Sequence, residues 1–257
     1  MAESEGGRVS RKWEKAQYSF EFVPFFVHLP KIVEKMKIAK LVFNPIQENT
    51  YIVWDDTLEC VIIDAGNFSA REDKILTDFI TARNLRPRYA INTHGHFDHT
   101  LGVNYLKETF GVEFALSAKD QFLLDNAATS GAIFGVKTDS MPSIDIDLDS
   151  LEEISFGETT LRIIPTPGHT PGHVALYEPT SKVLFTGDTL FRESIGRTDL
   201  PGGDYSWIMR SILENILPLG DEVRIYAGHG EESTIGHESM YNPFVVEVLN
   251  QEVNYKN

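Results

Sequence analysis

Short hydrophobic runs, bounded by glycine, proline and polar residues, recur along the chain from Met36 onward. Runs of four to eight residues that are rich in valine, isoleucine, leucine and phenylalanine are typical of buried or half-buried β-strands. We therefore predict strands over residues 37–43, 50–54, 60–64, 88–92, 112–116, 161–164, 174–177, 183–186 and 223–227.

Helical spacing separates several of these runs. Ile75, Phe79 and Ile80 share one face of a predicted helix over 70–84, and Ser69 with Glu72 has the spacing of a capping box. A second helix follows His99 and ends before Gly111. Further helices are predicted over 118–126, 205–216 and 238–252. Residues 127–136 are predicted to form a connection, and residues 138–149 a loop.

Two strand-rich halves, each with its own helices, indicate an α/β (α+β) fold in four layers, αββα, with two sheets face to face and helices outside. The 257 residues are sufficient for one such domain. We predict the domain over residues 36–257. Residues 1–35 are predicted to be an N-terminal extension, partly disordered or an appendage, with Met36 as an alternative start.

Composition narrows the function classes. Twenty-three lysines and arginines against 38 acidic residues give a formal charge of −15, which argues against nucleic-acid and anionic-membrane partners. The single cysteine, Cys60, lies in an apolar run and is expected to be a buried structural thiol. The chain begins without a signal-peptide pattern and carries no apolar run long enough to span a membrane, so we predict a cytoplasmic protein.

The densest group of candidate ligands lies in residues 93–99, which read Thr-His-Gly-His-Phe-Asp-His. This segment follows a predicted strand and holds three imidazoles and one carboxylate within six residues. Imidazole nitrogens and carboxylate oxygens are ligands for first-row metals, with zinc the usual occupant. One metal would not use all four groups together with the distant candidates described next, whereas two adjacent metals would.

Three more polar residues follow predicted strands, where layered folds place functional side chains. His169 lies in a Gly/Pro-rich turn, Asp188 follows the strand over 183–186, and His229 follows the strand over 223–227. We expect His94, His96 and His169 to bind one metal, and Asp98, His99 and His229 to bind another. Asp188 is expected to bridge the two.

Taken together, these motifs resemble the metallo-β-lactamase superfamily, and among its members the short bacterial glyoxalase II-like hydrolases. The resemblance rests on the His-x-His-x-Asp-His motif, Thr-Pro-Gly-His-Thr-Pro-Gly-His, Phe-Thr-Gly-Asp-Thr-Leu-Phe, Gly-Arg-Thr-Asp over 196–199, and Gly-His-Gly over 228–230, and it covers about residues 36–257. It implies an αββα sandwich with the metals at the edge between the sheets. Two features depart from the pattern: the C-terminal basic helical region of the fuller glyoxalase II enzymes is expected to be missing, and Asp199 stands where an aromatic residue is usual.

The resemblance implies a metal-dependent hydrolase of a thioester such as S-lactoylglutathione, which uses a metal-bridging hydroxide. It implies two divalent metal ions, with zinc expected and iron or manganese as alternatives. Asp98 is predicted to accept a proton as well as to bind metal, and Arg197 to contact the substrate. The partner is expected to be a small molecule, with a glutathione thioester as the candidate. An iron-dependent persulfide dioxygenase and a lactone hydrolase on the same site are the alternative functions, and the sequence leaves the oligomeric state open.

Three further residues are assigned supporting roles. His173 is expected to pack beside the ligands, because the seven ligand positions are already filled. His237 is expected at the rim or in a structural contact. Asp64, which ends a predicted strand, is expected either to orient a ligand histidine or to serve only the turn.

Overall fold

The computed structural model describes residues 36–138 and 140–255, with side chains as far as residue 250. The predictions for residues 1–35 therefore lie outside the described residues. Within the described residues, no helix is both long enough and apolar enough to cross a membrane.

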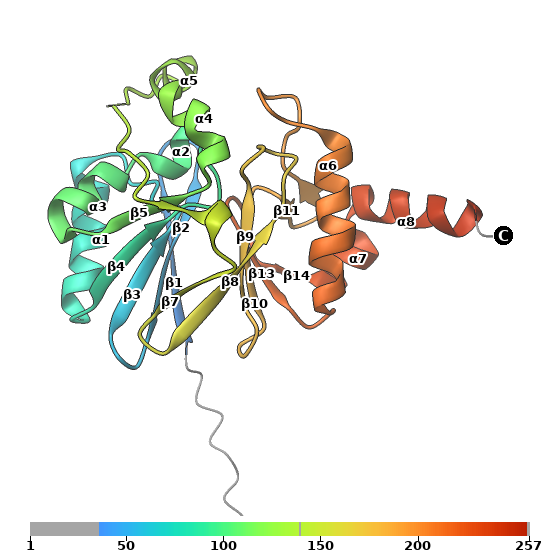
Figure 1. Ribbon diagram of the computed structural model, residues 1–257, viewed down its shortest axis with the longest axis horizontal. Coiled ribbons are helices and arrows are strands. Elements are labelled where there is room, and N and C mark those ends of the chain that lie inside the picture. The colour runs from blue at the N-terminus through green and yellow to red at the C-terminus, as the bar shows by residue number, and fades with distance from the viewer. Residues whose placement is uncertain (1–35, 139, 256–257) are drawn as a thin grey trace, which may run out of the picture. The chain divides into compact units, whose positions relative to one another are not determined.

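Two six-stranded sheets dominate the structure (Figure 1). The first has the order β1-β2-β3-β4-β5-β6, antiparallel from β1 to β3 and parallel from β3 to β6. The second has the order β14-β13-β10-β9-β8-β7, in which only β10 and β13 pair in parallel. The strands of the first sheet are β1 (Met36–Phe43), β2 (Glu48–Asp55), β3 (Glu59–Ile63), β4 (Arg86–Ile91), β5 (Glu113–Leu116) and β6 (Ile146–Asp147).

The second sheet is formed by β7 (Glu153–Phe156), β8 (Thr159–Pro165), β9 (Val174–Glu178), β10 (Val183–Gly187), β13 (Arg224–Ala227) and β14 (Ser233–Thr234). A small hairpin is made by β11 (Leu190–Phe191) and β12 (Ser194–Ile195). The helices are α1 (Ala70–Ala82), α2 (Phe97–Thr100), α3 (Val103–Phe110), α4 (Gln121–Asp125), α5 (Ala127–Ile133), α6 (Tyr205–Arg210), α7 (Ile235–Tyr241) and α8 (Pro243–Tyr255). A π-helical stretch, Ser211–Ile216, continues α6.

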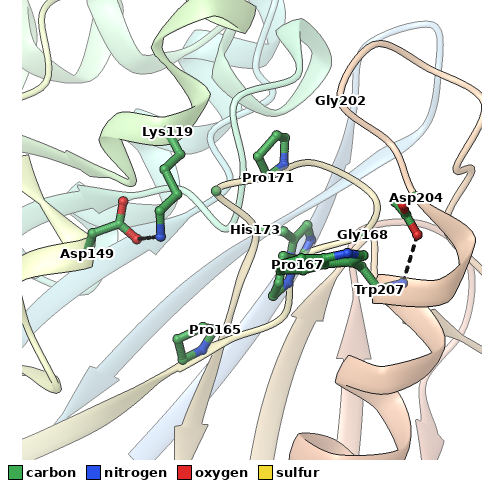
Figure 2. A pocket seen from close by; sticks show the side chains of 11 residues that line it. Lys119, Asp149, Pro165, Pro167, Gly168, Pro171, His173, Gly202, Asp204 and Trp207 are labelled. Carbon is green, nitrogen blue, oxygen red and sulfur yellow. Dashed lines mark hydrogen bonds and ion pairs between the residues drawn. The ribbon is translucent and has the colours of Figure 1, made fainter.

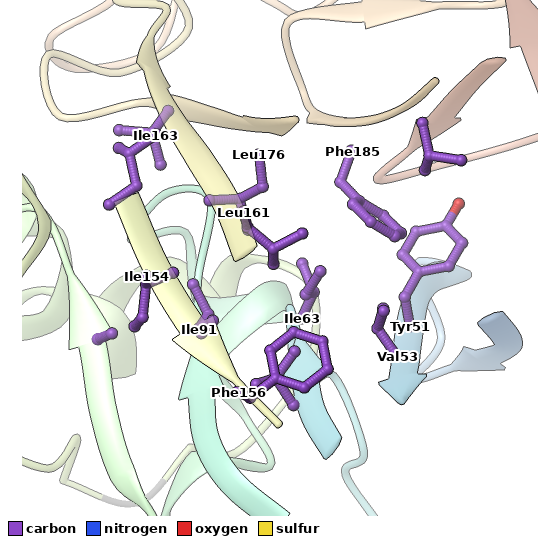
Figure 3. Packing of buried hydrophobic residues seen from close by; sticks show 14 of the residues in the cluster. Tyr51, Val53, Ile63, Ile91, Ile154, Phe156, Leu161, Ile163, Leu176 and Phe185 are labelled. Atoms are coloured by element: carbon purple, nitrogen blue, oxygen red, sulfur yellow. The ribbon is translucent and has the colours of Figure 1, made fainter. Parts of the chain in front are cut away.

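The central core fills the space between the two sheets (Figure 3). Tyr51 of β2 meets the second sheet directly, with its ring centroid 5.3 Å from that of Phe185. Its buried hydroxyl donates a 2.7 Å hydrogen bond to the Ala227 carbonyl, so the polar end of this core side chain has a partner. The other core residues include Val53, Ile63 and Ile91 from the first sheet, and Phe156, Leu161 and Leu176 from the second.

Each sheet has a second apolar face that its own helices cover. Leu76 and Ile80 of α1, with Leu106 of α3, pack on the outer face of the first sheet. Ile208 of α6 and Ile235 of α7 are in the cluster on the outer face of the second. The helix, sheet, sheet, helix order confirms the predicted four-layer αββα architecture.

Every predicted strand is present, with ends that differ by a few residues, and β6, β7, β11, β12 and β14 are additional. Of these, β6 lies within residues 138–149, which were predicted as a loop. The prediction of a connection over 127–136 was wrong, because α5 forms there despite Gly131. The predicted helix over 238–252 is two helices, α7 and α8, since Pro243 restricts the residue before it and Asn242 is extended. The helix predicted after His99 is likewise divided into α2 and α3.

Candidate metal centre

All seven predicted ligands come together at one edge between the sheets. His94 and His96 lie in the loop after β4, and Asp98 and His99 are in α2. The other three follow strands of the second sheet: His169 after β8, Asp188 after β10 and His229 after β13. A backbone hydrogen bond of 2.8 Å, from Asn49 N to the Gly228 carbonyl, links the two sheets beside this edge. Both halves of the chain are therefore required to complete the cluster.

The first group of potential ligands consists of His94, His96 and His169. His96 Nδ1 lies 2.9 Å from His169 Nε2. His94 Nε2 is buried and has no hydrogen-bond partner. A buried nitrogen without a partner is costly to the fold, so a ligand for it is expected.

The second group consists of Asp98, His99 and His229. His229 Nε2 is 3.3 Å from His99 Nε2 and 3.4 Å from Asp98 Oδ2. Nitrogens of two imidazoles that face each other at this distance cannot both be protonated donors. The two nitrogens point toward the same space, which is where a cation would bind.

Asp188 lies between the two groups. Its Oδ2 is 3.5 Å from His169 Nε2 of the first group and 3.6 Å from His229 Nε2 of the second. Its Oδ1 is 3.5 Å from His99 Nε2 and is buried without a hydrogen-bond partner. The arrangement of imidazole nitrogens and carboxylate oxygens fits divalent zinc, iron or manganese, with Asp188 in the position of a shared ligand.

In four of the five candidate ligand histidines, all except His96, the outer ring nitrogen faces an oxygen atom of the protein, which turns the other nitrogen toward the cluster. This orientation is the usual role of groups around a metal site. The contacts are Thr93 Oγ1 at 3.1 Å from His94 Nδ1, Asp64 Oδ2 at 3.3 Å from His99 Nδ1, the Arg197 carbonyl at 2.7 Å from His169 Nδ1, and the Gln47 carbonyl at 3.2 Å from His229 Nδ1.

Asp64 has the orienting position that was one of the two roles expected for it. Besides facing His99, it accepts hydrogen bonds from Thr93 N at 2.7 Å and from Thr93 Oγ1 at 2.8 Å. His173 is buried, as expected, and its Nε2 accepts a 3.0 Å hydrogen bond from Asp188 N. His237 lies apart from the cluster, with its Nε2 2.9 Å from Glu193 Oε1.

Asp120 is a supporting residue that the sequence reasoning missed. Its buried carboxylate accepts hydrogen bonds from Gly95 N at 2.9 Å, Thr170 Oγ1 at 2.7 Å and Gly172 N at 2.7 Å. These donors belong to the loop that carries His94 and His96 and to the loop that carries His169. One carboxylate thus ties together the two loops that provide the first group of ligands.

The electrostatic environment favours the metal-binding protonation states of His94, His96 and Asp188, but it favours the protonated form of His99. Burial and the neighbouring histidines lower the pKa of His94, and that of His96 to about 4, so both imidazoles are neutral. Burial raises the pKa of Asp188, but the surrounding histidines, His99 first, outweigh it and lower that pKa. The pKa of His99 is raised, because Asp188 and Asp98 outweigh its burial. A bound cation would replace the proton on His99.

A cavity of about 660 Å³ opens over the cluster. Five of the seven candidate ligands line it, all except His94 and His99. Arg197, the residue predicted to contact the substrate, also lines it. Its guanidinium makes two hydrogen bonds to Asp199, from Nε to Oδ1 at 2.9 Å and from Nη2 to Oδ2 at 2.8 Å.

A second cavity, of about 400 Å³, lies beside the loop that carries His169 (Figure 2). It is lined by Pro165, Pro167 and Pro171, together with His173 and Trp207. None of the seven candidate ligands lines it. The larger cavity is therefore the one that serves the cluster.

The fold and the clustered histidines and aspartates define a class of protein. The chain belongs to the metallo-beta-lactamase superfamily, whose family model matches residues 43–229. This confirms the resemblance drawn from the motifs. The protein is accordingly a metallo-hydrolase of a superfamily that binds divalent metals.

Three individual proteins show which members of the superfamily this chain is similar to. The chain is 38% identical to hydroxyacylglutathione hydrolase GloC of Haemophilus influenzae over 217 residues, which cover 82% of this chain and 98% of that protein. The crystal structure of the BLEG-1 B3 metallo-beta-lactamase is similar with a TM-score of 0.76 and 36% identity, covering 81% of this chain and 99% of that one. The crystal structure of TTHA1623 in a di-iron-bound form has a TM-score of 0.72 and 35% identity, covering 80% and 99%.

Proposed function

We propose that this metallo-hydrolase binds two divalent metal ions and hydrolyses thioesters, with S-lactoylglutathione as the first candidate substrate. The observation that carries the proposal is the pair of three-ligand groups with Asp188 between them, beneath a cavity of about 660 Å³. The name of the Haemophilus influenzae relative supports the substrate class.

In this proposal His94, His96 and His169 would hold one ion, Asp98, His99 and His229 would hold the other, and Asp188 would be shared between them. Two such ions would supply Lewis-acid polarisation of the thioester carbonyl and hydroxide near neutral pH. Zinc is the expected metal. TTHA1623, a relative 35% identical to this chain, was crystallised in a di-iron-bound form, which makes iron the principal alternative.

The reaction forms a C–O bond at the acyl carbon and breaks the C–S bond, which yields a carboxylic acid and a thiol from the thioester and one water. We assign Asp98 to accept the proton of that water and to return it to the departing thiolate. Its carboxylate is buried beside the cluster, and although burial raises its pKa, His99 and His229 outweigh the burial and lower it. The carboxylate is therefore ionised and able to accept a proton.

A thiolate is a good leaving group, which suits this site. Beyond the candidate ligands, the described residues that line the cavity offer one charged side chain, Arg197. We assign Arg197 to contact an anionic part of the thiol moiety. The predictions of a cytoplasmic location and of no nucleic-acid partner stay predictions.

The test combines elemental analysis of the purified protein with an S-lactoylglutathione hydrolysis assay. About two metal ions per chain and hydrolysis that His94→Ala abolishes would support the proposal. His237→Ala is the matched control, because this histidine lies outside the cluster and contacts Glu193. Its metal content and turnover are expected to equal those of the wild type.

Other results would replace the proposal. One iron per chain, no thioester hydrolysis and oxygen uptake with glutathione persulfide would assign the protein to the persulfide dioxygenases. Two metals with turnover of lactones but not of thioesters would keep the metal centre and change the substrate class.

A further inference from the structure

Apart from the candidate ligands, the residues that line the larger cavity are mainly apolar, and we call them its apolar wall. They come from the loop between β1 and β2, from α2, α4 and α5 with the residues that follow α5, and from the segment after Asp188. In Figure 1, α4 and α5 rise from the end of the first sheet at which α2 lies. The apolar lining residues on which the inference rests are Phe97 of α2, Ile133 at the end of α5 and Phe134 just beyond it.

Two of these side chains are unusually exposed. Ile133 is 78% exposed and Phe134 is 54% exposed, although both are large and apolar. Scattered exposed hydrophobic residues are ordinary, but adjacent ones that line a cavity above a catalytic cluster form a patch that a ligand can cover.

This patch is held by buried neighbours. Ala127 at the start of α5 and Val136 just beyond it are buried in a cluster with Phe97. At the end of α5 a backbone hydrogen bond of 3.0 Å, which Phe134 N donates to the Gly131 carbonyl, closes a turn. The rings of Phe97 and Phe134 lie 5.6 Å apart between centroids, so the exposed ring continues a buried apolar surface that begins at α2.

Beyond the candidate ligands, Arg197 is the one charged residue among the described residues that line the cavity. Asn126, Thr129 and Ser130 add only neutral polar groups among the described lining residues. Arg197 lies in the loop after β12, and Asp199 occupies two of its donors. A charged acyl group would lose its water against this wall, and the neutral groups of Asn126, Thr129 and Ser130 would replace only part of the lost hydrogen bonds.

We propose that the protein prefers thioesters whose acyl group is apolar and longer than lactoyl, and that Ile133 and Phe134 bind this group. The inference rests on the proposed thioester hydrolysis, in which the acyl carbon lies at the metal cluster and its substituent extends along the cavity. Each methylene buried on such a wall is expected to improve binding roughly fourfold until the wall is covered.

The test measures the affinity of the metal-loaded protein for S-methyl-, S-butyl-, S-hexyl- and S-octylglutathione by calorimetry. These thioethers cannot be hydrolysed, so binding is read independently of turnover. In parallel, kcat/KM is measured for the acetyl, butyryl, hexanoyl and octanoyl thioesters of glutathione and for S-lactoylglutathione. Because both residues are exposed, Phe134→Ala and Ile133→Ser are expected to fold normally. Met240→Ala is the matched control, since Met240 is 64% exposed on α7 and does not line the cavity.

We expect both affinity and kcat/KM to rise with the length of the alkyl or acyl chain. In Phe134→Ala and in Ile133→Ser, the gain for each added methylene should fall at least twofold. Met240→Ala should leave it unchanged. Affinity and turnover that do not change with chain length, or that are highest for methyl and lactoyl, would overturn the inference while leaving thioester hydrolysis intact. Affinity that rises with chain length without hydrolysis of any thioester would overturn the proposed function and retain the apolar binding wall.

Discussion

Replacing Asp120 with asparagine tests whether this carboxylate holds the two ligand loops in place. The substitution keeps the size of the side chain but removes the charge, and turns an NH₂ group toward at least one of three donors. Those donors are Gly95 N and Thr170 Oγ1 on one carboxylate oxygen, and Gly172 N on the other.

The expected magnitude follows from these three hydrogen bonds. A hydrogen bond to a charged group contributes roughly 1.5–3 kcal/mol, and a buried donor left without a partner costs about 1–3 kcal/mol. Burial raises the pKa of Asp120, so the native carboxylate already carries a desolvation cost that asparagine relieves. We therefore expect Asp120→Asn to reduce the free energy of unfolding by about 2 kcal/mol, and to weaken metal binding on the order of 10-fold or more.

The assay is urea denaturation in chelator, which gives stability without metal, followed by competitive metal titration of the folded protein. Asp55→Asn is the matched control. Asp55 is also buried and accepts four hydrogen bonds, from Thr57 N, Thr57 Oγ1, Glu158 N and Thr159 Oγ1, but it ends β2, whereas the metal cluster lies beside the start of that strand. Asp55→Asn should lower stability and leave metal affinity unchanged. If both variants lose stability and neither loses metal affinity, Asp120 serves the fold alone.

Three further predictions follow from other contacts. Asp199→Ala should free Arg197 and lower the KM for S-lactoylglutathione roughly twofold to fivefold, the size expected of an exposed charge pair, with the effect fading at high salt; an unchanged KM in steady-state kinetics would remove Arg197 from the site. Burial raises the pKa of Asp55, but hydrogen bonds from Thr57 and its neighbours outweigh it, and the net pKa is lowered. Its contribution to stability is therefore complete above the unfolded pKa of about 3.9 and is lost as the pH falls through the folded pKa. Hence the stability difference between wild type and Asp55→Asn, measured by urea denaturation from pH 6 to 3, should shrink only below about pH 4. Chelator should lower the melting temperature of the metal-loaded protein, since binding at 100-fold excess over Kd adds about 2.7 kcal/mol; in His94→Ala most of that shift should vanish, and an equal shift would show that His94 is not a ligand.

The sequence was sufficient to predict the layered fold because its strands are short apolar runs with clear boundaries. The ends of β3, β10 and β13 were predicted to within a few residues, because apolar runs give way there to polar residues, among them Asp64, Asp188 and His229. Parallel pairing of β3 with β4, and of β10 with β13, then places those ends at common edges. The sequence did not predict this pairing. Ligands from distant parts of the chain were grouped because each follows an apolar run and because the motifs together resemble those of one superfamily.

The parts that could not be predicted depend on contacts between distant segments. Asp120 sits in a stretch that reads as an ordinary helix start, and nothing in its neighbours along the chain indicates Gly95 or Gly172 as donors. The helix α5 was missed because the glycine and alanine of 127–136 have no amphipathic period, and its buried residues pack on Phe97 from another element. The break at Asn242 was missed as well, although Pro243 disfavours helix at the preceding residue and could have indicated it.

The division of the ligands between the two sheets has a consequence for how metal occupancy can be interpreted. Each three-ligand group contains members from both halves of the chain, so neither half alone holds a complete set. Metal held by these residues would therefore act as a clamp across the interface between the sheets, and its affinity would include the free energy of bringing the halves together. Metal affinity would then measure how well the two sheets are docked, and a cavity made at Phe185 or Tyr51 should be detectable as faster metal release at the edge of the interface.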